Sequence, residues 1–321
     1  MPLLHYFPGM AVLPDLSIRT YLPADRDVLA ALLAAPDVVE QYDMFAGATG
    51  VELLLADPYA PRDGVHLAFV GGEPAGFGYA IVLPGPPARW AVLRGAVLQR
   101  FRRHGIGRAL HDAVSAHLLA TGPLSECVIS AWQPNTGAED FTAALGYVGE
   151  RWMWLMERPR ERVPEPVWPS GVSVRTLDGG EAMLQDWTDA YNDSFAEHYR
   201  YVAAPIDHTR ELVQKPGFRD DGVLLAYRDG KVAGFCRDEV FDGRGEVGTL
   251  GTVHAARGIG LGRQLLRWGI DWLQRDNVLP VTLLVDGENE SALGLYRSEG
   301  FVVTRSRRTW ARKPAGAPEV A

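Results

Sequence analysis

Two kinds of hydrophobic pattern follow one another near the end of the chain. Residues 246–253 read EVGTLGTV, an apolar stretch of the type that forms a strand. After a short glycine-rich segment, one helical face is predicted by the spacing of Leu261, Leu265, Leu266, Gly269, Trp272 and Leu273. The pattern predicts a strand that passes through a tight turn into a helix.

The same succession occurs in the first half of the chain. The segment FRRHGIGRAL (101–110) leads into a second helical face, formed by Ile106, Ala109, Leu110, Ala113, Val114, His117 and Leu118. Each half also carries a predicted hairpin, at 66–83 and at 223–240. Antiparallel hairpins that lead into one strand–helix–strand crossover predict an α+β fold, with a mixed, mostly antiparallel sheet flanked by helices.

These parallels are part of an internal repeat. Five landmarks of the first half return in the second half, in the same order and 154 to 156 residues later. The pairs are Arg102 with Arg257, Gly105 with Gly260, SIRTYLP (17–23) with SVRTLDG (173–179), Asn135 with Asn289, and LGY (145–147) with EGF (299–301). A period this long indicates a duplicated domain and not a solenoid.

A proline-rich, charged segment separates the two halves and has the composition of a linker (ERPRERVPEPVWPSG, 157–171). We therefore predict four segments: an N-terminal domain over 1–157, a linker over 158–170, a C-terminal domain over 171–313 and a flexible tail over 314–321.

Composition restricts the possible partners. The 321 residues carry a formal net charge of −8, which argues against a nucleic-acid partner. Cys127 and Cys236 suggest neither a disulfide framework nor a metal site. No apolar run has the length of a membrane span, and the first ten residues lack the basic start of a signal peptide. A soluble, cytoplasmic monomer with no metal, no membrane and no nucleic-acid partner is expected.

The segment RGIGLG (257–262) has glycines at alternate positions, which lets a backbone come close to a ligand. It departs from the dinucleotide fingerprint because Gly262 comes one residue too early. It departs from the P-loop because Arg263 and Gln264 follow Gly262. Since the segment lies between a strand and a helix, its amides are expected to form an anion site at the helix N-terminus.

Together these motifs resemble a known family. Arg-x-x-Gly-x-Gly between a strand and a helix, followed by Asn-x-x-Ala and a Gly-aromatic pair, resembles the GNAT N-acetyltransferase superfamily, twice and over nearly the whole chain. The segments FAEHYR (195–200) and LVDGENESALGLYRSEGF (284–301) are similar to the mycothiol synthase branch of that superfamily. The resemblance implies two tandem GNAT-like domains, acetyl-CoA as the acyl donor and an amine as the acceptor.

The resemblance also implies two sets of acetyl-CoA contacts. The second half would contribute Thr252, Val253, Arg257, Gly258, Ile259, Gly260, Leu261, Gly262, Arg263 and Asn289. The first half would contribute Leu98, Arg102, Arg103, His104, Gly105, Ile106, Gly107, Arg108 and Asn135.

The catalytic groups implied by the resemblance occur in one half. A carboxylate base eleven residues before the motif arginine would be Glu246, and the first half has Ala91 there. A tyrosine acid seven residues after the motif asparagine would be Tyr296, and the first half has Thr142 there. The backbone near Leu250 would stabilise the oxyanion. The active site is therefore expected in the C-terminal domain, and the N-terminal domain is expected to bind CoA or to act as a scaffold.

Structural interpretations of the same residues stay open at this stage. Glu246 also fits a solvated carboxylate at a strand start, and Tyr296 fits a core aromatic residue. Asn135 and Asn289 also fit helix caps.

Three functions follow as hypotheses. The first is transfer of an acetyl group to the primary amine of a small molecule by direct attack in a ternary complex. The second is acetylation of the cysteinyl amine of a thiol precursor, as in mycothiol synthase. The third is a non-catalytic acyl-CoA-binding or sensing protein.

Overall fold

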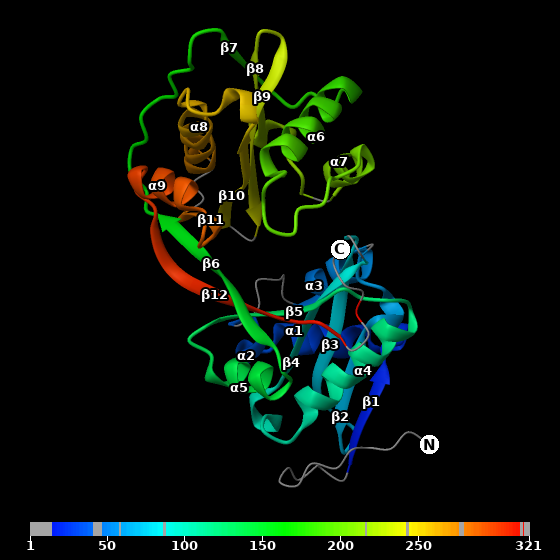
Figure 1. Cartoon of the computed structure of the whole chain (residues 1–321). Helices are drawn as coiled ribbons and strands as arrows, with labels where there is room; N and C mark the ends of the chain where they lie inside the picture. The colour runs from blue at the N-terminus through cyan, green and yellow to red at the C-terminus, as the bar shows by residue number, and fades with distance from the viewer. Residues whose placement is uncertain are drawn as a thin grey trace. The chain divides into compact units, whose positions relative to one another are not determined.

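The computed structural model describes residues 15–40, 47–57, 59–85, 88–215, 217–241, 244–275, 279–314 and 317. Contacts between residues divide the chain into two compact units (Figure 1). The first unit contains Met1–Arg151 and Arg307–Ala321, and the second contains Trp152–Ser306.

The first unit is a sheet with helices on both faces. Its strands, in spatial order, are β1 (Leu16–Thr20), β2 (His66–Val70), β3 (Glu73–Leu83), β4 (Trp90–Val97), β5 (Cys127–Gln133) and the end of β12 (Val302–Arg312). Its helices are α1 (Arg26–Ala34), α2 (Pro36–Val39), α3 (Gly47–Ala56), α4 (Ile106–Ala120) and α5 (Thr136–Ala144). Helix α1 packs in one core cluster with Phe77 and Tyr79, and α4 packs in another with Ala80 and Leu93.

The second unit repeats this plan. Its strands, in spatial order, are β7 (Val172–Thr176), β8 (Val223–Arg228), β9 (Lys231–Phe241), β10 (Arg244–Thr252), β11 (Val281–Asp286) and the end of β6 (Val148–Arg158). Its helices are α6 (Glu181–Phe195), α7 (Ile206–Val213), α8 (Leu261–Arg275) and α9 (Glu290–Ser298). Figure 1 shows α6 and α8 on opposite sides of β9 and β10, and both helices contact these two strands.

The sheets are mixed and mostly antiparallel, which confirms the predicted α+β class. Among the described residues, β4 pairs in parallel with β5, and β10 with β11. Each parallel ladder has two residue pairs, ending at Val92 opposite Val128 and at Glu246 opposite Thr282. The two strands of each pair then part, which leaves room for a ligand between their carboxyl ends.

The closing strand of each half lies in the sheet of the other half's unit. Residues 153–158 of β6 pair with β11 in the second unit. Residues 307–312 of β12 belong to the first unit, where Trp310 is buried and the Arg312 guanidinium donates to the Leu145 carbonyl oxygen at 2.8 Å. The compact units thus exchange about six residues at each predicted domain boundary.

Three further observations concern the tail, membrane spans and metal groups. Apart from residues 314 and 317, the predicted tail (314–321) lies outside the described residues. Within the described residues, no helix has the length and apolar character needed to cross a membrane. The same residues contain no group of three or more His, Cys, Asp or Glu side chains placed to hold a metal.

Candidate active site

A β-bulge in β10 distinguishes the second unit from the first. The register between β9 and β10 shifts between Val247 and Thr249, so Gly248 is the extra residue. The register between β3 and β4 is constant over all their pairs. The parallel ladders therefore match Glu246 with Val92, and not with Ala91 as equal spacing predicts. The correction leaves the first unit without an ionisable group at this position.

Polar side chains gather on the face of β9 and β10 that α6 covers. Glu246 is half-buried and lies opposite Glu239 in the antiparallel ladder. Arg237 forms an ion pair with Glu239 and donates to the Thr249 hydroxyl at 3.3 Å. Sequence reasoning singled out Glu246 but neither Glu239 nor Arg237, because the facing strand contains no family motif.

Tyr296 lies near the buried thiol of Cys236, on the opposite side of β9. Its ring packs edge-on against Phe301, with 6.0 Å between ring centroids. Burial, with a smaller contribution from Cys236, raises the pKa of Tyr296 to about 12. The phenol therefore keeps its proton at neutral pH, as an acid for a leaving group must. Leu250 is partly buried and lies opposite Cys236, two residues after the bulge.

The two glycine loops have the same backbone shape. Gly258 and Gly260 have φ of 80° and 83°, and their counterparts Arg103 and Gly105 have φ of 67° and 80°. A Cβ atom added at Gly258 or Gly260 would meet no protein atom within 4 Å. The backbone of the second loop thus borders open space at the start of α8, as close approach of an anion requires.

Each motif arginine binds a carboxylate of its own unit. The Arg257 guanidinium lies 3.0 Å from a Glu197 carboxylate oxygen and donates to the Ser194 carbonyl oxygen. In the first unit, Arg102 donates to the Val97 carbonyl oxygen at 2.8 Å and contacts the Asp37 carboxylate at 3.3 Å. The arginines therefore anchor the loops to neighbouring elements of the fold.

The anchoring of the second loop includes a histidine. His254 lies 2.9 Å from Asp193 through Nδ1 and 3.2 Å from Glu197 through Nε2. The hydrogen bond to Asp193, followed by that to Glu197, raises the pKa of His254. The backbone amide of His254 also donates to Asp193 at 2.6 Å, as that of Gln99 does to Asp37. The two aspartates are 156 residues apart, a repeat signal that sequence reasoning missed.

Other predicted contact residues have structural roles. The Asn135 and Asn289 side chains cap α5 and α9 by accepting hydrogen bonds from the amides of Ala138 and Ala292, which confirms the capping interpretation. Arg263 is directed to Ser298 and Glu299.

The remaining predicted contacts of the second half lie at the end of β10, in the glycine loop and at the start of α8. Thr252 ends β10, Val253 follows it, Ile259 lies in the loop, and Leu261 and Gly262 begin α8. That they contact acetyl-CoA stays a prediction.

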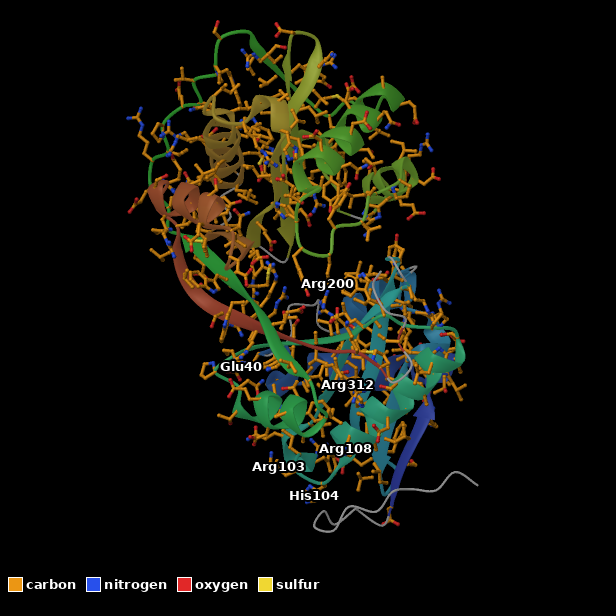
Figure 2. The ribbon with its side chains drawn as sticks, viewed as in Figure 1. Glu40, Arg103, His104, Arg108, Arg200 and Arg312 are labelled. Atoms are coloured by element: carbon orange, nitrogen blue, oxygen red, sulfur yellow. The ribbon has the colours of Figure 1, made fainter. Side chains whose placement is uncertain are left out.

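The first loop lines a cavity of about 910 Å³ in the first unit. Arg102, Arg103, Gly105, Ile106, Gly107, Arg108 and Asn135 line it, whereas Leu98 and His104 do not. Figure 2 shows Arg103, His104 and Arg108 at the same end of this unit. Side chains of β4 and β5 line the other end, where the two strands have parted.

Comparison with known proteins agrees with this architecture. The model of the acetyltransferase (GNAT) family matches residues 36–147 and again residues 181–301. Among solved structures, a GCN5-related N-acetyltransferase from Sphaerobacter thermophilus has a TM-score of 0.74 at 23% identity and covers 97% of this chain and 99% of its own. A tandem GNAT protein from the clavulanic acid biosynthesis pathway has a TM-score of 0.71 at 18% identity, covering 95% of this chain and 100% of its own.

Two relatives are closer in sequence. The mycothiol acetyltransferase of Thermobifida fusca is 32% identical, over 89% of this chain and 95% of the relative. That of Thermomonospora curvata is 36% identical, over 70% of this chain and 74% of the relative. With two matches to the family model and relatives at this identity, the chain belongs to the GNAT acetyltransferase family and carries its domain twice.

Proposed function

We propose that the protein transfers an acetyl group from acetyl-CoA to the primary amine of a small molecule, with the chemistry in the second unit. The observation that carries the proposal is the asymmetry between the two copies. The second unit has Glu246 where its parallel strands part and Tyr296 on α9. The first unit has Val92 and Thr142 at these positions.

The second loop fits the pyrophosphate of the donor. Its amides border open space, and Gly258 and Gly260 provide the left-handed conformations that shape it. When bound, acetyl-CoA supplies an activated acetyl thioester. Arg257, held by Glu197, fixes the loop from the side of α6.

The residues around β10 have complementary proton roles. Glu246 accepts the proton that the acceptor ammonium must lose before its nitrogen can attack. The backbone after the bulge, at Leu250, offers an amide to the oxygen that becomes negative. The hydroxyl of Tyr296 holds the proton that the leaving sulfur requires, and burial keeps that proton in place below about pH 12.

The α6-covered face of β9 and β10 supports an amine as the acceptor. Glu246 and Glu239 lie opposite one another on it, and Arg237 is already paired with Glu239. Carboxylates on this face attract a cationic group such as an ammonium.

Within this activity we propose the cysteinyl amine of the mycothiol precursor as the acceptor. The relatives named mycothiol acetyltransferase, which align over up to 95% of their length, support this choice. The competing function is that of an amine acetyltransferase of antibiotic biosynthesis or resistance. The tandem protein of the clavulanic acid pathway has the same fold as this chain. A non-catalytic sensor would not explain why both proton-handling groups occur in the same copy.

Release of free thiol from acetyl-CoA tests the proposal. The precursor amine should be acetylated with a kcat/KM at least tenfold above that of simple amino sugars or aminoglycosides. Preference for another amine would overturn the choice of acceptor. Absence of thiol release with every amine, by a protein that binds acetyl-CoA at its second loop, would favour the sensor.

A further inference from the structure

The cavity of the first unit joins the first glycine loop to the inner side of β4. Arg102, Arg103 and Gly105 line one end, and Arg94 lines the other. The carboxylates that line it are Asp37 and Asp140, each 3.3 Å from a loop arginine. No carboxylate among the lining residues is paired with Arg94.

The repeat shows how the end of the cavity at Arg94 differs from the face of β9 and β10 that α6 covers in the second unit. Ladder pairing matches Glu246 with Val92, Glu239 with Ile81, Arg237 with Tyr79, and Thr249 with Arg94. Two carboxylates and one guanidinium are thus replaced by a single guanidinium. The formal net charge of these four positions changes from −1 in the second unit to +1 in the first, so this part of the first unit favours an anion.

Arg94 lines the cavity with a buried nitrogen that no described protein group satisfies. Its Nε is buried and has no hydrogen-bond partner among the described residues. It pairs in the ladder with Tyr79, which is buried and whose pKa burial raises. Arg307, stacked over Trp132 at 5.5 Å, brings a second guanidinium to the cavity wall. A buried donor without a partner is costly, and a bound anion would remove that cost.

We propose that the first unit binds an acyl-CoA whose acyl group ends in a carboxylate, with the carboxylate at Arg94. This rests on the proposed use of the glycine loops for CoA. Because one continuous cavity connects the loop to Arg94, a single extended ligand can occupy both ends. The ligand is bound and not consumed: Val92 cannot accept a proton, and the Thr142 hydroxyl is hydrogen-bonded to the Ala138 and Glu139 carbonyl oxygens.

Calorimetry on the full chain can isolate this site. Gly258→Asp places a carboxylate in the second loop, where its left-handed φ suits Asp and the space is open. Gly258→Asn, with a side chain of the same size and no charge, separates the steric part of the loss of binding at the second loop from the electrostatic part. In the Gly258→Asp background, succinyl-CoA should bind at least tenfold more tightly than acetyl-CoA, because a charge-assisted bond to Arg94 is added.

Variants of Arg94 test whether this residue causes the preference for succinyl-CoA over acetyl-CoA. Arg94→Met in the same background should remove the preference for succinyl-CoA and leave the acetyl-CoA affinity within about twofold; Arg94→Lys should keep part of it. Equal affinity for both esters in the parent protein, or an equal loss for both in Arg94→Met, would overturn the proposal. Free succinate added with acetyl-CoA should not reproduce the effect; if it does, the anion belongs to a separate ligand and the acyl assignment is wrong.

The outcome is separable from that of the proposed function. If the Gly258→Asp protein binds neither ester while the wild-type protein acetylates amines, the inference about the first unit fails and the activity of the second unit stands. If the first unit prefers succinyl-CoA but no amine is acetylated, the inference stands and the proposed activity fails.

Discussion

At the scale of single residues, the proposed chemistry depends on one carboxylate that the first unit lacks. Glu246→Gln should lower kcat by about 10²–10⁴-fold, because it removes the proton acceptor without changing the shape of the side chain. The loss should shrink as pH rises, since more of the acceptor amine is then already neutral. Thiol release measured from pH 6 to 10 checks this.

Two control variants sharpen the result. Val92→Ala, at the matching position of the first unit, should leave kcat within about twofold. Tyr296→Phe should slow turnover while unfolding temperature stays nearly constant, because only a hydroxyl is removed. Equal losses from Val92→Ala and Glu246→Gln would contradict the placement of the active site in the second unit.

Asp238 carries a different kind of prediction, concerning stability. It is buried beneath α8, where the Cys236 thiol donates to it at 3.6 Å, and Oδ2 has no hydrogen-bond partner among the described residues. Desolvation raises its pKa well above the usual value, against smaller opposing effects of the Cys236 hydrogen bond and of Arg237. The unfolded chain loses this proton near pH 4, whereas the folded chain keeps it. Stability should therefore fall as pH rises from about 4 toward the folded pKa.

Asp238→Asn should remove this pH dependence. Compared with the wild-type protein, the variant should gain up to about 1.4 kcal/mol for each pH unit between 5 and the folded pKa. Urea denaturation at pH 5, 6, 7 and 8 measures it. Asp229→Asn, at an exposed turn position with φ of 51°, is the control that should show no such trend. Parallel stability curves for Asp238→Asn and wild type would contradict a neutral Asp238.

At the scale of elements, the bulge at Gly248 separates Glu246 from the following part of β10 by one extra residue. Deleting Gly248 would give the constant register seen between β3 and β4, with Glu246 still opposite Glu239. The local bend and extra twist that a bulge gives its strand would be lost, and with them the direction in which Glu246 is aimed. We expect kcat to fall more than 100-fold, while acetyl-CoA affinity changes less than threefold because the loop follows the unaltered part of β10. Steady-state kinetics and calorimetry on the same samples separate the two.

The control keeps the bulge. A Cβ at Gly248 would come within 2.9 Å of the flexible end of Glu239, so Gly248→Ala should shift that side chain and retain most of the activity. Wild-type turnover in the deletion variant would show that the bulge has no catalytic role.

The hydrophobic pattern and turn residues predicted the helices, hairpins and loops well. They did not predict the bulge or the contacts between residues that only folding brings together. The helices at Ile106–Ala120 and Leu261–Arg275, both hairpins and the two glycine loops follow from spacing and turn chemistry that neighbouring residues determine. The bulge was not located, because the offset of the repeat varies between 154 and 156 without marking where the extra residue lies. Glu197 was missed because its ion-pair partner, Arg257, is brought near it only by folding. Glu239 was missed because only the pairing of β9 with β10 places it opposite Glu246.

At the scale of the whole molecule, the exchanged strands make each unit depend on both ends of the sequence. Residues 1–157 alone lack Trp310, which is buried in the core of the first unit. Residues 171–313 alone lack Met156, which is fully buried in the core of the second. Losing a buried large side chain and a sheet strand costs several kcal/mol, comparable with the stability of a small domain.

Cutting the chain at the predicted linker should therefore yield unstable halves. Residues 1–157 expressed alone should show poor amide dispersion by NMR and rapid proteolysis. The same segment with residues 302–314 joined to its end by a flexible linker should regain a cooperative unfolding transition. A well-folded 1–157 fragment would show that the end of β12 is dispensable to the first unit.

The exchange also bears on how the duplicated gene could change. If each copy depends on the other to complete its sheet, as predicted above, loss of either copy would destabilise the one that stays, and selection for a folded protein would retain the first copy. Its pocket is then free to diverge: substitutions at positions 92 and 94 could favour anion binding while the second unit keeps its own chemistry. A duplicate with no base can thus persist through structural dependence, and a new ligand can be acquired during that time.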